Sequence, residues 1–176
     1  MNSPECGKPT ILIAEDDDDD RLFLETAFGR LKALYQLSFV ADGEELMDYL
    51  HRRGKYGRSK PPRPGLVLLD LNMPKKDGRK ALLEIKRDDR LKTIPVIVWT
   101  TSSLEEDMRL CKEAGAEGYV TKPSNLADFN AAIAEIVKAW VEPSRAHDEG
   151  PLNRMVNRVH GPRELAGGRL ERRRDL

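Results

Sequence analysis

The sequence predicts an α/β fold in which helices cover both faces of a parallel sheet. Short apolar runs alternate along the chain with amphipathic helical stretches, and this alternation is typical of a doubly wound parallel sheet. The apolar runs are almost unbroken, as expected for strands that are buried on both faces. We expect strands at about 10–14, 37–41, 65–70, 94–100 and 117–121.

Start signals for helices follow several of these strands. The run Asp17–Asp20 fits the loop and first turn of a helix, where negative charge is favourable. A second helix is expected to begin around Asp42–Glu45. Two pairs of the capping-box type indicate later helix starts: Ser103 with Glu106 and, more weakly, Asn125 with Asp128.

The last predicted helix, at about 125–141, has an apolar stripe at helical spacing. Its members are Leu126, Phe129, Ile133, Ile136, Val137 and Trp140. The stripe is expected to face the core, whereas Trp140, at the end of the helix, is a candidate for contact with a partner. The segment 54–65 is rich in Gly, Pro and basic residues, which predicts a long surface connection without regular structure.

Composition limits the possible classes of protein. The 176 residues, 39% hydrophobic and 34% charged, suit one compact domain with some surplus chain. Thirty basic residues balance thirty acidic ones, so the net charge gives no reason to expect general affinity for nucleic acids or membranes. The two cysteines make no disulfide framework, and no apolar run is long enough for a signal peptide or a membrane span. We therefore expect a cytoplasmic protein.

Three segments are expected along the chain: an N-terminal extension over 1–8, one domain over 9–141, and an arm over 142–176. In the arm the apolar periodicity fails and Gly, Pro and Arg become frequent. Such a segment buries too little apolar surface to offset the entropy of ordering it, so we expect it to be largely disordered. The 34 residues from 143 to 176 hold eight arginines against five acidic residues.

Polar side chains stand at the carboxyl ends of four apolar runs. They are Glu15 and Asp16 after the first run, Asp70 after the third, Thr100 at the end of the fourth and Lys122 after the fifth. Because the carboxyl ends of parallel strands meet at one edge of a sheet, we expect these groups to lie close together. Carboxylate oxygens are the ligands that Mg²⁺ prefers, and a lysine can pair with a carboxylate or a phosphoryl group.

This series of strand-end groups resembles the response-regulator receiver domain of two-component signalling, over residues 9–141. The resemblance implies a flavodoxin-like (βα)₅ fold with strand order 2-1-3-4-5. It also implies a bound Mg²⁺ and a cis peptide bond between Lys122 and Pro123. A receiver is not an enzyme in the usual sense, since it promotes only its own phosphorylation and dephosphorylation.

The resemblance carries a role to each matching residue. It implies Asp70 as the phosphoacceptor; Glu15, Asp16, Asp70 and the backbone carbonyl of Asn72 as metal ligands; Thr100 and Tyr119 as the switch pair; and Lys122 as the phosphoryl-binding lysine. Thr101 stands where most receivers carry Ala, Gly or Ser, which would narrow access to the phosphoryl group and alter its lifetime.

Partners are implied in the same way. The phosphoryl donor would be a phosphohistidine on a sensor histidine kinase or a histidine phosphotransfer protein. The segment 69–79, the Trp-Thr-Thr-Ser segment at 99–102 and the basic loop before the third strand are similar to single-domain regulators that pair with phytochrome kinases. In that branch the last helix and the arm form homodimers, which would place Phe129, Ile133 and Trp140 at an interface.

Two other functions share part of this pattern. Mg²⁺-dependent phosphatases of the haloacid dehalogenase type also use a strand-end Asp, but they need a second Asp two residues later, where this chain has Asn72. A DNA-reading module needs a hydrophobic core that the 34 residues from 143 to 176 do not supply, so DNA contact would have to come from the Arg-rich arm alone.

Overall fold

The computed structural model describes residues 8–29 and 35–141, apart from the side chains of residues 140 and 141. All pairings in its five-stranded sheet are parallel, in the order β2-β1-β3-β4-β5. The strands are β1 (Thr10–Ala14), β2 (Gln36–Val40), β3 (Leu66–Leu69), β4 (Val96–Thr100) and β5 (Gly118–Thr121). The predicted flavodoxin-like fold and its strand order are therefore confirmed.

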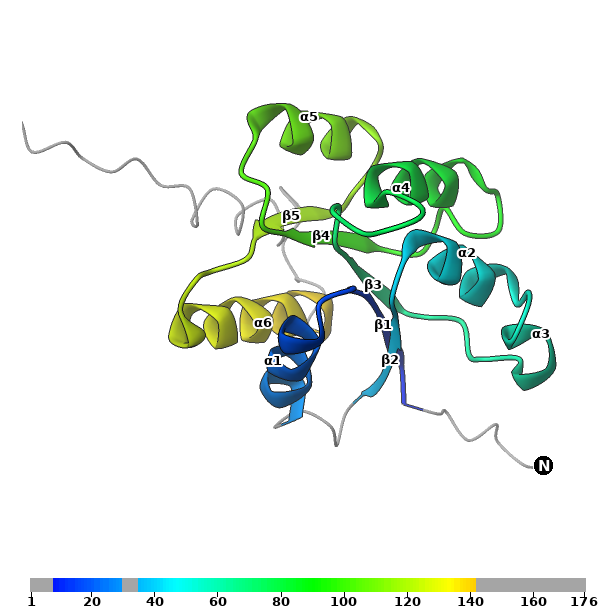
Figure 1. Ribbon diagram of the computed structural model, residues 1–176, viewed down its shortest axis with the longest axis horizontal. Coiled ribbons are helices and arrows are strands. Elements are labelled where there is room, and N and C mark those ends of the chain that lie inside the picture. The colour runs from blue at the N-terminus through cyan, green and yellow to red at the C-terminus, as the bar shows by residue number, and fades with distance from the viewer. Residues whose placement is uncertain (1–7, 30–34, 142–176) are drawn as a thin grey trace, which may run out of the picture.

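Helices cover both faces of this sheet. They are α1 (Asp18–Gly29), α2 (Gly43–His51), α3 (Tyr56–Ser59), α4 (Gly78–Arg87), α5 (Glu105–Glu113) and α6 (Leu126–Val141). Figure 1 shows α1 and α6 together on one face, with α2, α4 and α5 on the other. No helix of the described residues is long and apolar enough to cross a membrane.

Alternation along the strands divides the core into two layers. In β1, Ile11 and Ile13 pack under α1 and α6, whereas Leu12 and Ala14 pack under α2, α4 and α5. No residue of β1 is more than 1% exposed. Burying one such large aliphatic side chain contributes about 1.5–3 kcal/mol. This two-sided burial holds the carboxyl ends of the strands in fixed positions.

Helices begin at all four predicted places, α1 with Asp18, Asp19 and Asp20 in its first turn, but one of the predicted capping pairs does not form. Asp42 caps α2 through its Oδ1, which accepts a hydrogen bond from the Glu45 N–H at 2.8 Å. The Asn125 side chain likewise accepts a bond from the Asp128 N–H at 2.9 Å. The expected pair of Ser103 with Glu106 does not form, because α5 begins after Leu104 with no side-chain cap.

The loop 54–65 also differs in part from the expectation of no regular structure, since it contains the one-turn helix α3. Tyr56 holds this turn in place. Its ring packs edge-on against Tyr49 at 5.0 Å between centroids, and its hydroxyl donates to Glu45 Oε1 at 2.8 Å. A tertiary contact therefore stabilises a helical turn that the local Gly and Pro content disfavours. The expected arm over 142–176, and the extension before Lys8, lie outside the described residues.

Candidate functional site

Three carboxylates meet at the carboxyl ends of β1 and β3. Glu15 and Asp16 follow β1, and Asp70 follows the neighbouring β3, where its N–H donates to Ala14 O at 3.0 Å. One oxygen from each carboxylate lies within 4.8 Å of the others. Glu15 and Asp70 are buried, whereas Asp16 is exposed. We call these three residues the acidic cluster; it is the grouping that the sequence predicted at this edge.

Lys122, which follows β5, reaches across the sheet edge to this cluster. Its Nζ donates to Glu15 Oε2 and to Asp70 Oδ2, each at 2.7 Å. A third bond of 2.7 Å goes to Asp20 Oδ2. The Lys122 side chain is 5% exposed, so all three bonds form in a largely water-excluded place. The structure thus brings together the predicted lysine and carboxylates, and it adds Asp20, which the sequence analysis assigned only to a helix start.

Burial dominates the electrostatics of the cluster. It raises the pKa of Glu15 to about 7, even though Lys122 acts in the opposite direction. Burial alone would lower the pKa of Lys122, but the charges of Asp70 and Glu15 raise it above its ordinary value, so the ammonium keeps its proton. The acidic cluster and Asp20 together bring four carboxyl groups to this edge, and the Lys122 ammonium contacts three of them, Glu15, Asp20 and Asp70.

This donor set fits a hard divalent cation. Carboxylate oxygens are the usual ligands of Mg²⁺, and a second cation would relieve the repulsion among acids that one lysine leaves uncompensated. Asp70 Oδ1 accepts a bond of 3.0 Å from the Asn72 N–H, which fixes the orientation of the carboxylate. The carbonyl of Asn72 stays a predicted ligand.

Gly78, the first residue of α4, is a site residue that the sequence analysis missed. A Cβ at this position would lie 2.1 Å from the Asp70 carbonyl oxygen and 2.8 Å from the Leu71 Cα. Its N–H donates to the Leu71 carbonyl at 2.9 Å. Only a residue without a side chain lets α4 approach the backbone of Asp70 so closely, and Gly78 is thereby part of what holds Asp70 in place.

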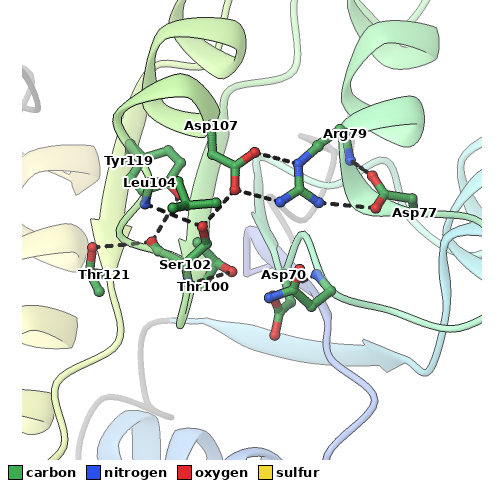
Figure 2. Close-up of polar contacts among 10 residues, drawn as sticks. Asp70, Asp77, Arg79, Thr100, Ser102, Leu104, Asp107, Tyr119 and Thr121 are labelled. Carbon is green, nitrogen blue, oxygen red and sulfur yellow. Dashed lines mark hydrogen bonds and ion pairs between the residues drawn. The ribbon is translucent and has the colours of Figure 1, made fainter.

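The predicted switch pair lies on the α5 side of the cluster. Thr100 is fully buried, and its Oγ1 accepts a bond of 3.3 Å from the Ser102 N–H. Tyr119 is 5% exposed, and its hydroxyl donates to Ser102 O at 3.0 Å (Figure 2). Burial raises the pKa of that hydroxyl. Ser102, which the sequence analysis did not single out, therefore connects the two. Thr101 is exposed beside them.

Two expectations need correction. Phe129 and Ile133 are 4% and 1% exposed, and Phe129 packs edge-on against Trp99 at 5.0 Å between centroids. Both side chains belong to the chain's own core, so they are not free to form the expected interface; the Trp140 side chain lies outside the described residues. The expected cis bond between Lys122 and Pro123 is also wrong, since no cis peptide bond occurs among the described residues.

Comparisons with known proteins agree with this geometry. Residues 11–134 match the family model of the response regulator receiver domain. Response regulator Rcp1 of Synechocystis sp. is 40% identical over 141 residues, which cover 80% of this chain and 95% of Rcp1. Similar solved structures include the Mn²⁺-bound form of response regulator Rcp1, with a TM-score of 0.70 and 38% identity over 80% of this chain and 99% of that one. The phosphorylated cyanobacterial phytochrome response regulator RcpA gives a TM-score of 0.74 and 35% identity, covering 81% of this chain and all 100% of its own.

Proposed function

Because the chain belongs to the response regulator receiver domain family, we propose that Asp70 accepts a phosphoryl group from a phosphohistidine of a partner protein. The partner is a sensor histidine kinase or a histidine phosphotransfer protein. The observation that carries the proposal is the bond of 2.7 Å between Lys122 Nζ and Asp70 Oδ2. It places a cation beside a buried strand-end carboxylate whose orientation is fixed by the Asn72 N–H.

The transfer needs positioning and charge neutralisation more than covalent chemistry from the protein. A carboxylate oxygen of Asp70 forms a bond to phosphorus as the bond from phosphorus to the imidazole nitrogen breaks. The nitrogen keeps the electron pair and takes up a proton. Lys122 then exchanges its bond with the Asp70 carboxylate for a bond to a phosphoryl oxygen, and so stabilises the acyl phosphate.

The acidic cluster would hold Mg²⁺ for this step, through Glu15, Asp16 and Asp70. A bound divalent ion neutralises phosphoryl oxygens that a carboxylate would otherwise repel. Support comes from the three carboxylate oxygens within 4.8 Å of one another, and from the similar Rcp1 structure, which is described as a Mn²⁺-bound form. The candidate ligands are all hard oxygen donors, which suit Mg²⁺ and Mn²⁺ alike, and we propose Mg²⁺ as the ion of this site.

The switch pair would report the phosphorylation. New phosphoryl oxygens on Asp70 offer acceptors to the Thr100 hydroxyl, which among the described residues makes no hydrogen bond to Asp70. A bond there draws the loop after β4 toward Asp70 and so favours the inward position of Tyr119, whose hydroxyl binds Ser102 in that loop. Thr101, exposed at the same loop, would limit access of water to the phosphoryl group. The result is a shift between conformations that exist before phosphorylation.

A phytochrome-type kinase is the partner class we propose. Support comes from the similarity to RcpA, which is described as a phytochrome response regulator, over 81% of this chain. A phosphotransfer profile against purified histidine kinases, read at short times, tests this choice. Preference for a kinase without a phytochrome sensor would contradict the pairing and leave the role of Asp70 intact.

Phosphorylation of Asp70 is tested with a small donor. Incubation with acetyl phosphate and Mg²⁺ should add one phosphoryl group, stable in acid and labile to base and hydroxylamine. Asp70→Asn should abolish it, because the amide is neither anionic nor nucleophilic. Asp89→Asn is the matched control, since the Asp89 side chain is 91% exposed at the surface. Equal phosphate on Asp70→Asn would overturn the proposal.

A further inference from the structure

A partly buried ion pair joins α4 to α5 on the face of the sheet that carries Tyr119. Arg79, in the first turn of α4, contacts Asp107, in the first turn of α5, through two parallel bonds (Figure 2). Nε lies 2.6 Å from Oδ1 and Nη2 lies 2.5 Å from Oδ2. The Asp107 side chain is 8% exposed and that of Arg79 is 29% exposed. Such two-point contacts fix orientation as well as distance.

The ion pair is the centre of a longer network. On the α4 side, Arg79 Nη1 lies 3.0 Å from Oδ2 of Asp77, the residue that caps α4. On the α5 side, the Ser102 hydroxyl donates to Asp107 Oδ2 at 2.6 Å. The carbonyl of Ser102 in turn accepts the bond from the Tyr119 hydroxyl. One continuous set of contacts therefore runs from the loop after Asp70 to the switch tyrosine (Figure 2).

Few side chains attach α5 to the rest of the protein, so this pair is one of its main contacts. Within α5 only Asp107 and Cys111 are buried, whereas α4 buries four residues. No side chain caps the start of α5. Leu104 and Leu110 are 65% and 42% exposed, so they contribute little to its packing. In the first turn of α5 only Asp107 is fully buried, and Met108 packs partly against the core, so the contact with Arg79 is a large part of what holds this turn.

The charge of Asp107 depends on Arg79. The guanidinium and its hydrogen bonds hold the pKa of Asp107 below its usual range, although burial acts in the other direction. A buried carboxylate without a partner is costly, so Asp107 must stay where Arg79 can reach it. Since Ser102 donates its hydroxyl to the same carboxylate oxygen, the position of the loop at 101–104 follows from that of Arg79.

We propose that Arg79 is a positioning residue of the switch: through Asp107 and Ser102 it holds the loop after β4 where the Tyr119 hydroxyl can bind. The proposal rests on the proposed function in treating Thr100 and Tyr119 as the switch pair. The ion pair favours the arrangement in which Tyr119 is bonded inward. Without it that arrangement becomes less populated, and phosphorylation of Asp70, which favours the same arrangement, becomes slower.

The test uses three variants: Arg79→Gln, Asp107→Asn and the double variant with both changes. Each single variant both removes the ion pair and leaves the charge of the other partner unpaired. The double variant removes the ion pair without leaving an unpaired charge, so it separates these two effects. Arg109→Gln is the matched control. Arg109 also lies on α5 and pairs with Glu113 at 2.8 Å, but both side chains are more than half exposed.

The first measurement follows Tyr119 itself in protein labelled with fluorotyrosine, with Tyr119→Phe identifying its ¹⁹F NMR signal. In all three variants this signal should shift toward that of exposed fluorotyrosine. Amide hydrogen exchange over residues 102–107 should become at least about ten-fold faster. In Arg109→Gln both should match the wild-type protein. A wild-type Tyr119 signal in the double variant would overturn the proposal, because the single variants would then act only through an unpaired charge.

The second measurement is the rate at which acetyl phosphate phosphorylates Asp70. All three variants should be slower than the wild-type protein and than Arg109→Gln. Failure of the proposed function and failure of the present proposal are distinguishable: if no variant and no wild-type protein is phosphorylated, the NMR signal still decides the role of Arg79. Equal rates in the wild-type protein and the variants, with a displaced Tyr119, would contradict the link to phosphorylation.

Discussion

The ammonium of Lys122 lies 2.7 Å from the carboxylate of Asp20, across 102 positions of sequence. Asp20 stands in the first turn of α1, and its side chain is 27% exposed. Asp20 accepts one of the three hydrogen bonds that the Lys122 ammonium donates, and Glu15 and Asp70 accept the other two. Asp20 therefore competes with the phosphoryl group that Lys122 is proposed to bind.

Replacement of Asp20 should make phosphorylation easier. In Asp20→Asn the amide keeps the shape of the side chain but attracts Lys122 less, so the lysine moves to the phosphoryl oxygens at a lower cost. A difference of about 1 kcal/mol corresponds to about five-fold in the rate with acetyl phosphate. Asp19→Asn, which removes the same charge from an exposed neighbour, is the control. A rate in Asp20→Asn at or below that of Asp19→Asn would contradict this competition.

Contacts of this kind mark the limit of what the sequence predicts. The strands could be placed within about two residues because buried strands produce apolar runs that can be seen locally. The acidic cluster and Lys122 could be expected because the carboxyl ends of parallel strands share an edge. Which of the aspartates after Asp16 turns inward depends on where α1 lies relative to β5, and no local pattern encodes that.

The start of α5 and the face of α6 show the same limit. Ser103 and Glu106 have the spacing of a capping box, yet the Ser102 hydroxyl binds Asp107 instead, because Arg79 holds that carboxylate from another helix. An apolar stripe shows which residues of a helix share a face but not what covers it. In α6 the chain's own sheet covers Phe129 and Ile133, and the interface expected there is wrong for both.

The close approach of α4 to Asp70 predicts a large effect of Gly78→Ala. The added Cβ would lie 2.1 Å from the Asp70 carbonyl oxygen, so the backbone must shift. Overpacking of this kind typically costs about 1–3 kcal/mol, and the displaced Asp70 should also be phosphorylated more slowly. Gly57→Ala is the control, since the nearest contact of its added Cβ is at 3.4 Å. Urea unfolding measures the free energy of unfolding of both variants. Equal values for Gly78→Ala and Gly57→Ala would contradict a close approach of α4 to the backbone of Asp70.

The acidic cluster predicts that millimolar Mg²⁺ raises the thermal stability of the unphosphorylated protein, since the ion binds the folded state and relieves repulsion among the carboxylates. Asp16→Ala should remove this stabilisation, and chelation should reverse it in the wild-type protein. Asp19→Ala, at an exposed position in the same acidic run, should retain it. A melting temperature that Mg²⁺ leaves unmoved in the wild-type protein would show that the cluster is not a metal site.

The pair of Arg79 and Asp107 predicts a loss of stability in acid. Arg79 lowers the pKa of Asp107 below the ordinary value of 3.8. At a pH between the lowered pKa of Asp107 in the folded protein and its ordinary pKa in the unfolded chain, the unfolded chain binds more protons than the folded one. The free energy of unfolding therefore decreases as the pH falls through this range. The advantage of the wild-type protein over Asp107→Asn should be complete above about pH 5 and shrink as the pH falls below it. Urea unfolding of both proteins across this range tests it, and an advantage independent of pH would contradict the assignment.

A homodimer formed through the end of α6 remains the prediction for how the switch signal reaches another chain. Phe129 and Ile133 are used inside the core, so the interface must depend on the end of the stripe, at Trp140, and on exposed positions such as Leu126, which is 54% exposed. Sedimentation of the wild-type protein should show a dimer. Truncation of a buried interface aromatic commonly costs about 2 kcal/mol or more, so Trp140→Ala should weaken the dimer at least about thirty-fold.

Leu83→Ala supplies the control for this measurement. Leu83 is also a partly exposed apolar residue, at 39%, but it lies on α4, on the opposite face of the sheet from α6. Its truncation should leave the dimer affinity unchanged. Phosphorylation of Asp70 should change the affinity of the wild-type dimer. The loop after β4 is bonded through Ser102 to Tyr119 on β5, and β5 is followed in the chain by α6, where the interface is expected. A wild-type monomer, or a Trp140→Ala dimer as tight as that of Leu83→Ala, would rule this interface out.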